Sequence, residues 1–224
     1  MNIRSCAFPI LLGLAGGATA ETVSVLYEVA FKGGPVATQT VTLAGADGLT
    51  TVTSGFEAAL PVFVVLQHYS ESLSASCRPD GTVVQFSARR IDGGLRVETA
   101  GELEEDGRLR VVRSAPDGTT TNWFLRADYD FHSLALYGTA PADFLPTNQP
   151  ARVLSIADGR IEPVAVQVVD ESDTFERQHL YSAHLVWTAG PFTSHSWHPE
   201  RFSNLPRRYI RQTENGEFTF TLQR

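Results

Sequence analysis

The stretch DGTVVQFSARRIDGGLRVETAGELEEDGRLRVVRSAPDG, Asp80 to Gly118, decides the fold. Four Asp-Gly pairs divide it into short segments, and an Asp-Gly pair tolerates the positive φ values of tight hairpin turns. The pairs recur every 8–14 residues or so, about the spacing expected of a meander of short antiparallel strands. The stretch therefore predicts consecutive β-hairpins.

The same turn signal recurs along the rest of the chain, at Asp47-Gly48, Asp158-Gly159 and Asn215-Gly216. Between the turns, apolar and polar side chains alternate with period two, which places one row on a core face and the other in water. The apolar rows are Val25, Tyr27, Val29 and Phe31; Val84, Phe86 and Ala88; Val164, Val166 and Val168; and Phe218, Phe220 and Leu222.

Helical signal is weak. Phe56 to Leu66, broken by Pro61, and Phe131 to Tyr137 are the candidates, and each is expected to form a turn or one loose helical turn. Pro141 to Pro150 is expected to be a loop that crosses between parts of the sheet. We predict one all-β domain over residues 21–224. It is a single, strongly curved antiparallel sheet, a half-barrel or open barrel, of about 10–12 strands with little helix.

Residues 1–20 have the pattern of a cleaved signal peptide. Arg4 precedes an apolar run from Phe8 to Leu14, and the small residues that follow end in Ala18-Thr19-Ala20. We expect cleavage before Glu21 and a periplasmic or secreted location. No run approaches the ~20 apolar residues that a membrane-spanning helix needs, so no span is expected.

Composition excludes some partners. The formal net charge is −7, and without Arg4 it becomes about −8. Because phosphate neutralisation needs grouped Lys and Arg, no nucleic-acid partner is expected. Without the leader, Cys77 is the one cysteine, so no internal disulfide forms; a buried, inert thiol is favoured over pairing between chains.

The segment SHSWHPE, Ser194 to Glu200, resembles a reactive site because two histidines surround a tryptophan. The flanking prolines and the alternation favour a strand, in which His195 and His198 point to opposite faces. A zinc site needs three or four ligands on one side. We therefore expect no metal and no cofactor, and no catalytic residue is nominated by motifs for hydrolases, nucleotides or dinucleotides. A dispersed Ser-His-Asp triad stays open.

Four segments carry a resemblance to a known family. They are VLYEVAFKGGPVATQTVTL at residues 25–43, VVLQHYSESLSASCRPDGTVVQFSAR at 64–89, LSIADGRIEPVAVQVV at 154–169, and SHSWHPERFSNLPRRYIRQTENGEFTFTLQR at 194–224. Together they resemble a family of uncharacterised exported bacterial proteins known as a domain of unknown function. The chain departs from that pattern at Cys77 and Phe131-His132, where tryptophans are expected. The layout of the family is similar to the curved half-barrels of periplasmic lipoprotein carriers, which implies shelter for acyl chains.

Three functions remain open. The first is a non-enzymatic binder of a lipid or other apolar ligand, closed by Phe56 to Leu66 and Phe131 to Phe144. The others are an envelope hydrolase with a site built from loops, and a module that binds another envelope protein. The surplus of large apolar side chains favours the binder, although a packed core also uses such residues. Its candidate ligand-binding residues are Phe56, Phe63, Tyr69, Trp123, Tyr137, Phe144, Trp187 and Trp197.

Overall fold

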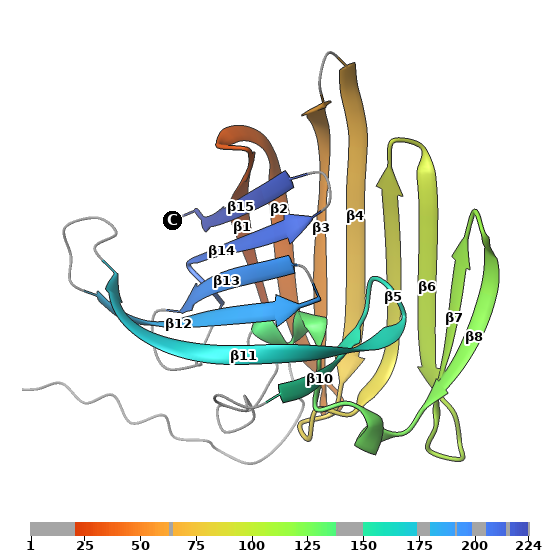
Figure 1. Cartoon of the computed structure of the whole chain (residues 1–224). Coiled ribbons are helices and arrows are strands. Elements are labelled where there is room, and N and C mark those ends of the chain that lie inside the picture. The colour runs from red at the N-terminus through yellow and green to blue at the C-terminus, as the bar shows by residue number, and fades with distance from the viewer. Residues whose placement is uncertain are drawn as a thin grey trace, which may run out of the picture.

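The structure is a computed structural model that describes residues 21–62, 65–137, 150–173, 180–190, 192–198, 205–213 and 216–223. In these ranges the chain forms one sheet of fifteen strands (Figure 1). The strands are β1 Glu21–Phe31, β2 Gly34–Ala46, β3 Leu49–Val62, β4 Val65–Cys77, β5 Val83–Asp92, β6 Leu95–Leu103, β7 Leu109–Ala115, β8 Gly118–Phe124, β9 Phe131–His132, β10 Pro150–Ser155, β11 Arg160–Asp173, β12 Leu180–Ala189, β13 Phe192–His198, β14 Arg208–Thr213 and β15 Gly216–Leu222. Two short 3-10 helices, η1 Arg126–Asp128 and η2 Ser133–Tyr137, complete the described elements.

The chain runs outward and then back through the sheet. Strands β1 to β8 form one antiparallel meander, and β10 to β15 form a second that returns to β1. β15 pairs with β1, so the first and last strands lie together at the centre of the strand order. β8 and β9 are the two edges, and only η1 and its flanking residues separate them in sequence. The sheet is thus an open barrel, and all its described ladders are antiparallel except the one between β9 and β10.

The turn prediction is confirmed in detail. The glycine of each of the seven Asx-Gly pairs has a positive φ. This conformation costs a residue with a Cβ atom more than it costs glycine. Turns without that signature were missed: Lys32-Gly33 joins β1 to β2, and Gly190 lies in the turn between β12 and β13. The strand number therefore exceeds the expected 10–12.

The apolar rows lie inside the barrel. Tyr27, Val29, Phe218 and Phe220 are almost completely buried, as the alternation predicts. One row is out of step, because Val83 rather than Val84 is buried. The β4–β5 register shifts beside Cys77, and this bulge moves the side chain that faces the core by one residue.

One of the two helical expectations needs correction, whereas the loose helical turn expected within Phe131 to Tyr137 is present as η2. Phe56 to Leu66 does not form a turn or helical turn over its described residues, which belong to the long strands β3 and β4. Pro61 is accommodated close to the end of β3 because β2 pairs with β3 only as far as Gly55, so one edge of β3 is unpaired there. Phe131 to Tyr137 is a short strand followed by η2. The described residues hold no helix long and apolar enough to cross a membrane.

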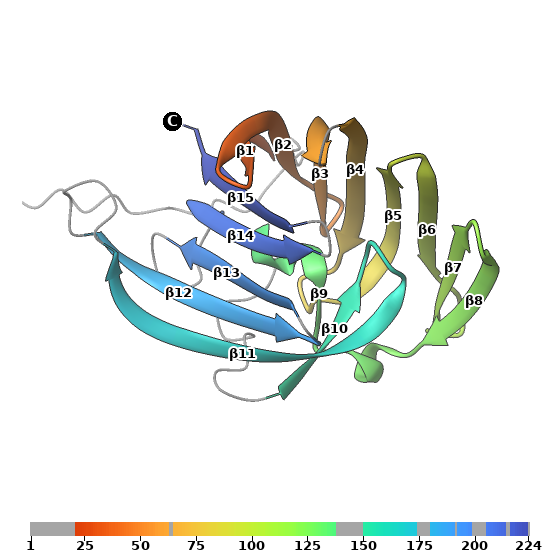
Figure 2. The ribbon, with the colours of Figure 1, turned by 45° about the horizontal axis from the view of Figure 1, so that its top comes forward.

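The sheet curls until its two halves meet. Figure 2 shows the β10–β11 hairpin reaching the strands β5 to β7. There Thr99 Oγ1 donates to the Ala157 carbonyl at 3.0 Å, and Arg90 lies 3.4 Å from Asp158. A Cβ on Gly159 would contact the side chains of Thr99 and Val111, which shows how closely the hairpin approaches. These contacts join the outward half to the returning half.

Candidate functional site

A cavity of about 860 Å³ lies between strands β4 to β6 and strands β10 to β14. The curl of the sheet creates it, because the inner rows of the two halves face one another without filling the space between them. Its wall is largely aliphatic and aromatic. The main apolar contributors are Leu73, Leu95, Leu134, Val153, Ile161 and Trp187.

An ion pair stands inside this cavity. Arg211 Nη1 donates to Glu71 Oε1 at 2.8 Å, and the Tyr69 hydroxyl donates to Glu71 Oε2 at 3.1 Å. The Glu71 side chain is 4% exposed, whereas the Arg211 side chain is 29% exposed. Burial acts to lower the pKa of Arg211, but the charges of Glu71 and its neighbours raise it overall, so the guanidinium stays cationic.

Arg211 keeps unused hydrogen-bonding capacity. Its Nε is buried and has no hydrogen-bond partner, and its guanidinium carbon lies 5.7 and 5.6 Å from the ring centroids of Phe218 and Phe220. A guanidinium carries five N–H donors, and in this site they meet mainly aromatic faces and one carboxylate. Nη2 also donates to the Tyr69 hydroxyl at 3.4 Å, so the group is a cation held by two side chains at one point of the cavity wall.

A chain of hydrogen bonds holds the tyrosines of the site. Tyr137 donates to Tyr209 at 2.8 Å, and Tyr209 donates to Gln39 Oε1 at 2.6 Å. Gln39 Nε2 in turn donates to Ser54 Oγ at 2.8 Å. The chain links η2, β14, β2 and β3, and it fixes the Tyr137 and Tyr209 rings where they line the cavity. Burial raises the pKa of both hydroxyls, which stay protonated.

Charges along the cavity wall are nearly balanced. Its charged residues are the arginines Arg90, Arg160 and Arg211 and the carboxylates Glu71, Asp92, Asp158 and Glu162. Arg160 Nε lies 2.7 Å from Glu162 Oε1, and Arg90 faces Asp158. Such a wall does not create a strong field of one sign. It is suited to a ligand with a small net charge.

Three predicted ligand-binding residues, Tyr69, Tyr137 and Trp187, line the cavity. Phe56 instead stacks on Tyr69 in the packed core, with ring centroids 5.4 Å apart. Phe63 and Phe144 lie outside the described residues.

The other two predicted tryptophans do not line the cavity. Trp123 is 45% exposed. It pairs with Arg110, whose neighbour Val111 faces the core, so Trp123 lies on the outer face. Trp197 stacks on His184 with centroids 4.5 Å apart, and the strand alternation sets it opposite the inward Ser196.

The histidines of SHSWHPE lie on opposite faces of β13, as predicted from the strand pattern. His195 shares a face with Trp197, and His198 bonds to Ser196 at 3.1 Å. The sequence did not indicate that β12 would bring His184 Nε2 to within 3.0 Å of His195 Nδ1. Across the described ranges, no three His, Cys, Asp or Glu side chains form a group suited to a metal ion.

Cys77 is buried, as expected, and has a partner that the sequence did not suggest. Its Sγ lies 3.1 Å from His132 Nε2. Burial raises the pKa of Cys77 to about 11, while burial and then Arg126 lower the pKa of His132 to about 4. At neutral pH both groups are uncharged. The pair therefore lacks the thiolate that a cysteine nucleophile requires.

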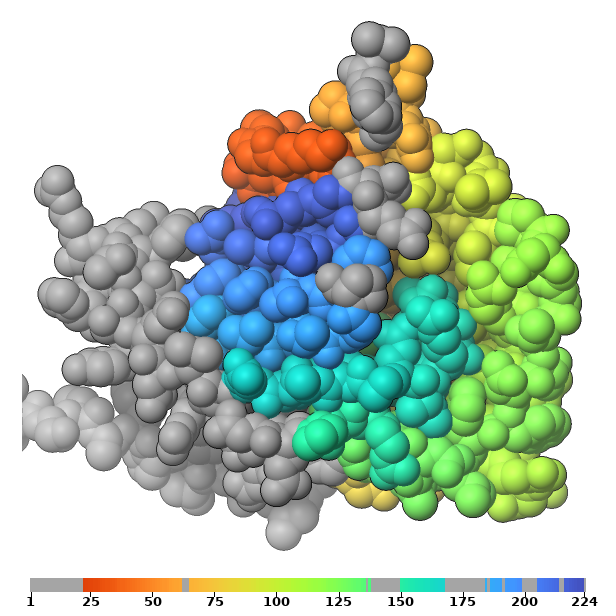
Figure 3. All heavy atoms as spheres, in the orientation of Figure 1, coloured from red at the N-terminus to blue at the C-terminus, as the bar shows by residue number. Residues whose placement is uncertain are grey.

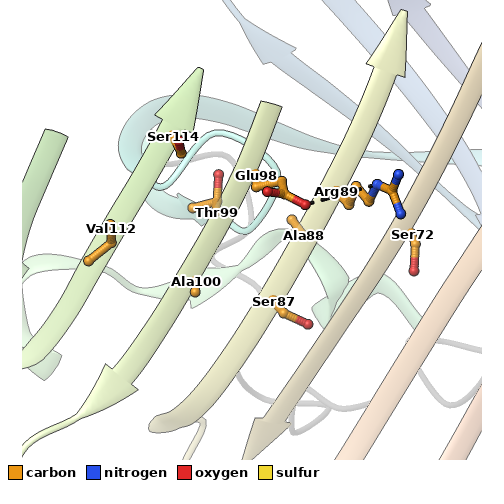
Figure 4. Close-up of a pocket in the computed structure, with 9 residues that line it drawn as sticks. All are labelled: Ser72, Ser87, Ala88, Arg89, Glu98, Thr99, Ala100, Val112 and Ser114. Atoms are coloured by element: carbon orange, nitrogen blue, oxygen red, sulfur yellow. Dashed lines mark ion pairs between the residues drawn. The ribbon is translucent and has the colours of Figure 1, made fainter. Parts of the chain in front are cut away.

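A second, smaller hollow of about 380 Å³ lies over β4 to β7 (Figure 4). Small side chains such as Ser72, Ser87 and Ala100 leave this space, and Arg89 and Glu98 form an ion pair 4.0 Å long beside it. Both charged side chains are about half exposed. Thr99 is buried and also lines this hollow, but its hydroxyl already donates to the Ala157 carbonyl at 3.0 Å.

Comparison with known proteins gives a likeness of fold. No family model and no curated protein matches the chain. The chain is similar to the crystal structure of a beta-barrel-like protein of domain of unknown function DUF1849 from Brucella abortus, with a TM-score of 0.56 and 12% sequence identity. The match covers 90% of this chain and 95% of that one. The protein thus has the open, barrel-like all-β fold seen in that structure.

Proposed function

We propose that this chain is an exported protein that binds one lipid or other apolar small molecule in the central cavity and performs no covalent chemistry on it. The observation that carries the proposal is the cavity of about 860 Å³ between the two halves of the sheet. Small-molecule sites commonly measure ~300–1,000 Å³ and combine apolar walls with a few polar groups. The cavity has that size and composition.

The wall favours a ligand with one polar end. Leu134, Val153 and Trp187 contact the apolar part, whereas the accessible part of the Arg211 side chain, which is 29% exposed, meets an oxygen acceptor. Glu71 already neutralises Arg211. A polar end of little or no net charge therefore gains hydrogen bonds without opposing the carboxylate. Fatty alcohols, acylglycerols and the ester region of a phospholipid have this chemistry.

Export fits this function. The leader pattern of residues 1–20 sends the chain to the cell envelope, where water-insoluble molecules need a protein to shield them between membranes. A curved sheet with few covering helices offers such a shield. The periplasmic or secreted location is part of the proposal.

A hydrolase is the second candidate, because Ser196 and His198 form a hydrogen bond at 3.1 Å beside the cavity. A serine nucleophile needs such a base. However, Ser196 is 1% exposed, and Trp187 Nε1 also donates to its Oγ at 3.4 Å. A substrate carbonyl has no open approach to that oxygen. The pair is better explained as a bond that satisfies buried polar groups on the inner face.

Native mass spectrometry and organic extraction of protein purified from the bacterial envelope test the binder. We expect one small amphipathic molecule per chain. Trp187→Ala removes part of the cavity wall and is expected to lose the ligand, while Trp197→Ala on the outer face keeps it. A chain recovered without ligand, or equal ligand in both variants, would overturn the proposal. Turnover of p-nitrophenyl esters that Ser196→Ala abolishes would favour the hydrolase.

A further inference from the structure

Strands β3 and β4 continue beyond the sheet as a two-stranded ribbon. β2 pairs with β3 only as far as Gly55, and β5 pairs with β4 only as far as Tyr69. Past those points β3 and β4 pair only with each other, up to Val62 and Val65. Figures 1 and 3 show this ribbon, in orange, standing above the neighbouring strands. It is a projection rather than a groove.

The end of the ribbon is apolar on both of its faces. Val65 is 61% exposed and Leu66 is 74% exposed. As consecutive strand residues they point in opposite directions, and Pro61, across from Leu66, is exposed as well. A strand with one face in the core normally turns polar residues outward. This end lacks that polar face, although the ribbon is covered nearer the sheet, where Leu60 is buried.

The neighbouring hairpin extends this apolar surface. The Gly93 amide donates to the His68 carbonyl at 3.0 Å, which sets the β5–β6 turn against the base of the ribbon. Leu95 follows that turn and is 63% exposed. Two adjacent hairpin ends thus each expose apolar side chains, Val65 and Leu66 on one and Leu95 on the other, with the hydrogen-bonded Gln67 and Asp92 side chains between them. Exposed apolar side chains at such ends are a liability unless they have a partner.

The chemistry of the ribbon suits the interface of a lipid bilayer. The sequence AALPVFVVL, residues 58–66, has no charged or polar side chain. β3 and β4 pair with each other up to Val62 and Val65, so the backbone groups on their facing edges are bonded, while those on the outer edges stay in the hydrated headgroup region during shallow insertion. Backbone groups that leave water unpaired are costly in hydrocarbon, so a paired hairpin end enters the interface more easily than an open loop.

A second copy of the chain fits this surface poorly. Each partner of a stable protein interface buries about 800 Å², far more than three aliphatic side chains on a narrow projection supply. Shallow insertion into a membrane surface needs no such matching area, because lipid surrounds each side chain. The projecting shape and the small area therefore favour lipid.

The apolar hairpin ends also adjoin the cavity. Leu95 belongs to both surfaces, since it lines the cavity and is one of the exposed apolar side chains. Asp92, on the other side of the same turn, lines the cavity too. A membrane that meets the hairpin ends therefore lies next to the cavity wall.

We propose that Val65 and Leu66 of the β3–β4 ribbon and Leu95 of the β5–β6 hairpin insert into the surface of a lipid bilayer and dock the protein there, with the cavity wall at Leu95 next to the lipid. Docking goes beyond the proposed ligand binding. Only the purpose of docking, which is to pass an amphipathic ligand between membrane and cavity, rests on the proposed ligand binding.

Co-sedimentation of the full mature chain with phosphatidylcholine vesicles, with and without phosphatidylglycerol, tests docking. The wild type is expected to partition onto both kinds of vesicle. Leu66→Asp is expected to weaken partitioning roughly tenfold, the loss that follows when one largely exposed leucine no longer enters lipid. Leu125→Asn is the matched control, because Leu125 is 50% exposed beside η1, away from both hairpins, and it is expected to bind like the wild type.

The outcomes separate docking from ligand binding. Trp187→Ala is expected to lose the cavity ligand and keep vesicle binding, while Leu66→Asp keeps the ligand and its far-ultraviolet circular dichroism. Docking is overturned if the wild type stays in the supernatant, or if Leu66→Asp and Leu125→Asn bind equally. A concentration-dependent dimer that Leu66→Asp dissolves would instead assign the hairpin ends to a second copy and overturn the lipid proposal.

Discussion

Acid is expected to destabilise this protein through His132. The imidazole is 2% exposed, on the short strand β9, and its Nε2 lies 3.1 Å from Cys77 Sγ. Burial, followed by the positive charge of Arg126, lowers its pKa to about 4. In an unfolded chain a histidine titrates near pH ~6.5. The native state therefore binds this proton far less readily than the unfolded state.

The sign and size follow from that difference. Above pH ~6.5 neither state holds the proton, so the free energy of unfolding does not depend on this group. Between pH ~6.5 and about 4 the unfolded state binds the proton and the native state does not, so the free energy of unfolding falls as the pH falls. A difference of about 2.5 pKa units corresponds to ~3 kcal/mol, at about 1.4 kcal/mol for each unit. Small domains have a free energy of unfolding of ~5–15 kcal/mol. Protonation of this one histidine thus removes a large share of the free energy of unfolding of a small domain.

Urea denaturation at several pH values between 7.5 and 4 measures this effect. His132→Phe keeps an aromatic ring, although a larger one, and removes the titrating group. The fall in its free energy of unfolding between pH 7.5 and 4 is therefore expected to be ~3 kcal/mol smaller than that of the wild type, whatever the absolute stability of the variant. His68→Phe is the control, because His68 has a half-exposed side chain, and its pH dependence is expected to follow the wild type. Parallel curves for the wild type and His132→Phe would refute the reasoning.

Three further predictions concern packing, the buried ion pair and export. Gly101→Ala places a methyl group against the Phe86 ring and is expected to lower the free energy of unfolding, measured by urea denaturation, by ~1–3 kcal/mol. Gly45→Ala, where no atom lies within 4 Å of the added carbon, is expected to change that free energy by less than ~0.5 kcal/mol. Equal effects of the two variants would contradict the close packing of Phe86 on Gly101. Glu71→Leu leaves a partly buried guanidinium without its carboxylate and is expected to cost ~2–4 kcal/mol, so an unchanged urea midpoint would contradict the ion pair. Mass spectrometry of protein from the cell envelope is expected to find Glu21 at the N-terminus, and retention of Met1 would argue against cleavage.

Local chemistry made much of the fold predictable. Asx-Gly turns and period-two rows depend on neighbouring residues only, and both appear in the structure where the sequence places them. The strand number was underestimated because Gly190 and the Lys32-Gly33 turn carry no Asx-Gly signature. Pairing of β1 with β15 depends on residues at opposite ends of the chain, and no local pattern encodes it.

The candidate site was predictable only in part, because its composition depends on which face each residue takes. Tyr69, Tyr137 and Trp187 were found as large apolar residues, yet the same criterion also selected Trp123, which lies outside. Arg211 was missed. Arg211 on β14 pairs with the buried Phe218 on β15, so its side chain faces the interior. Only the register between these two strands shows this.

Quenching of tryptophan fluorescence by a dibrominated fatty alcohol tests the central claim most directly, because bromine quenches only the rings that it contacts. Trp187 lines the cavity, whereas Trp123 and Trp197 do not. A variant that keeps Trp187 alone is expected to be quenched with saturation at one probe per chain, and the unbrominated alcohol is expected to compete. A variant with Trp187→Phe that keeps the other two is expected to stay bright. Quenching of the outer tryptophans with Trp187 unaffected would contradict a ligand in the cavity.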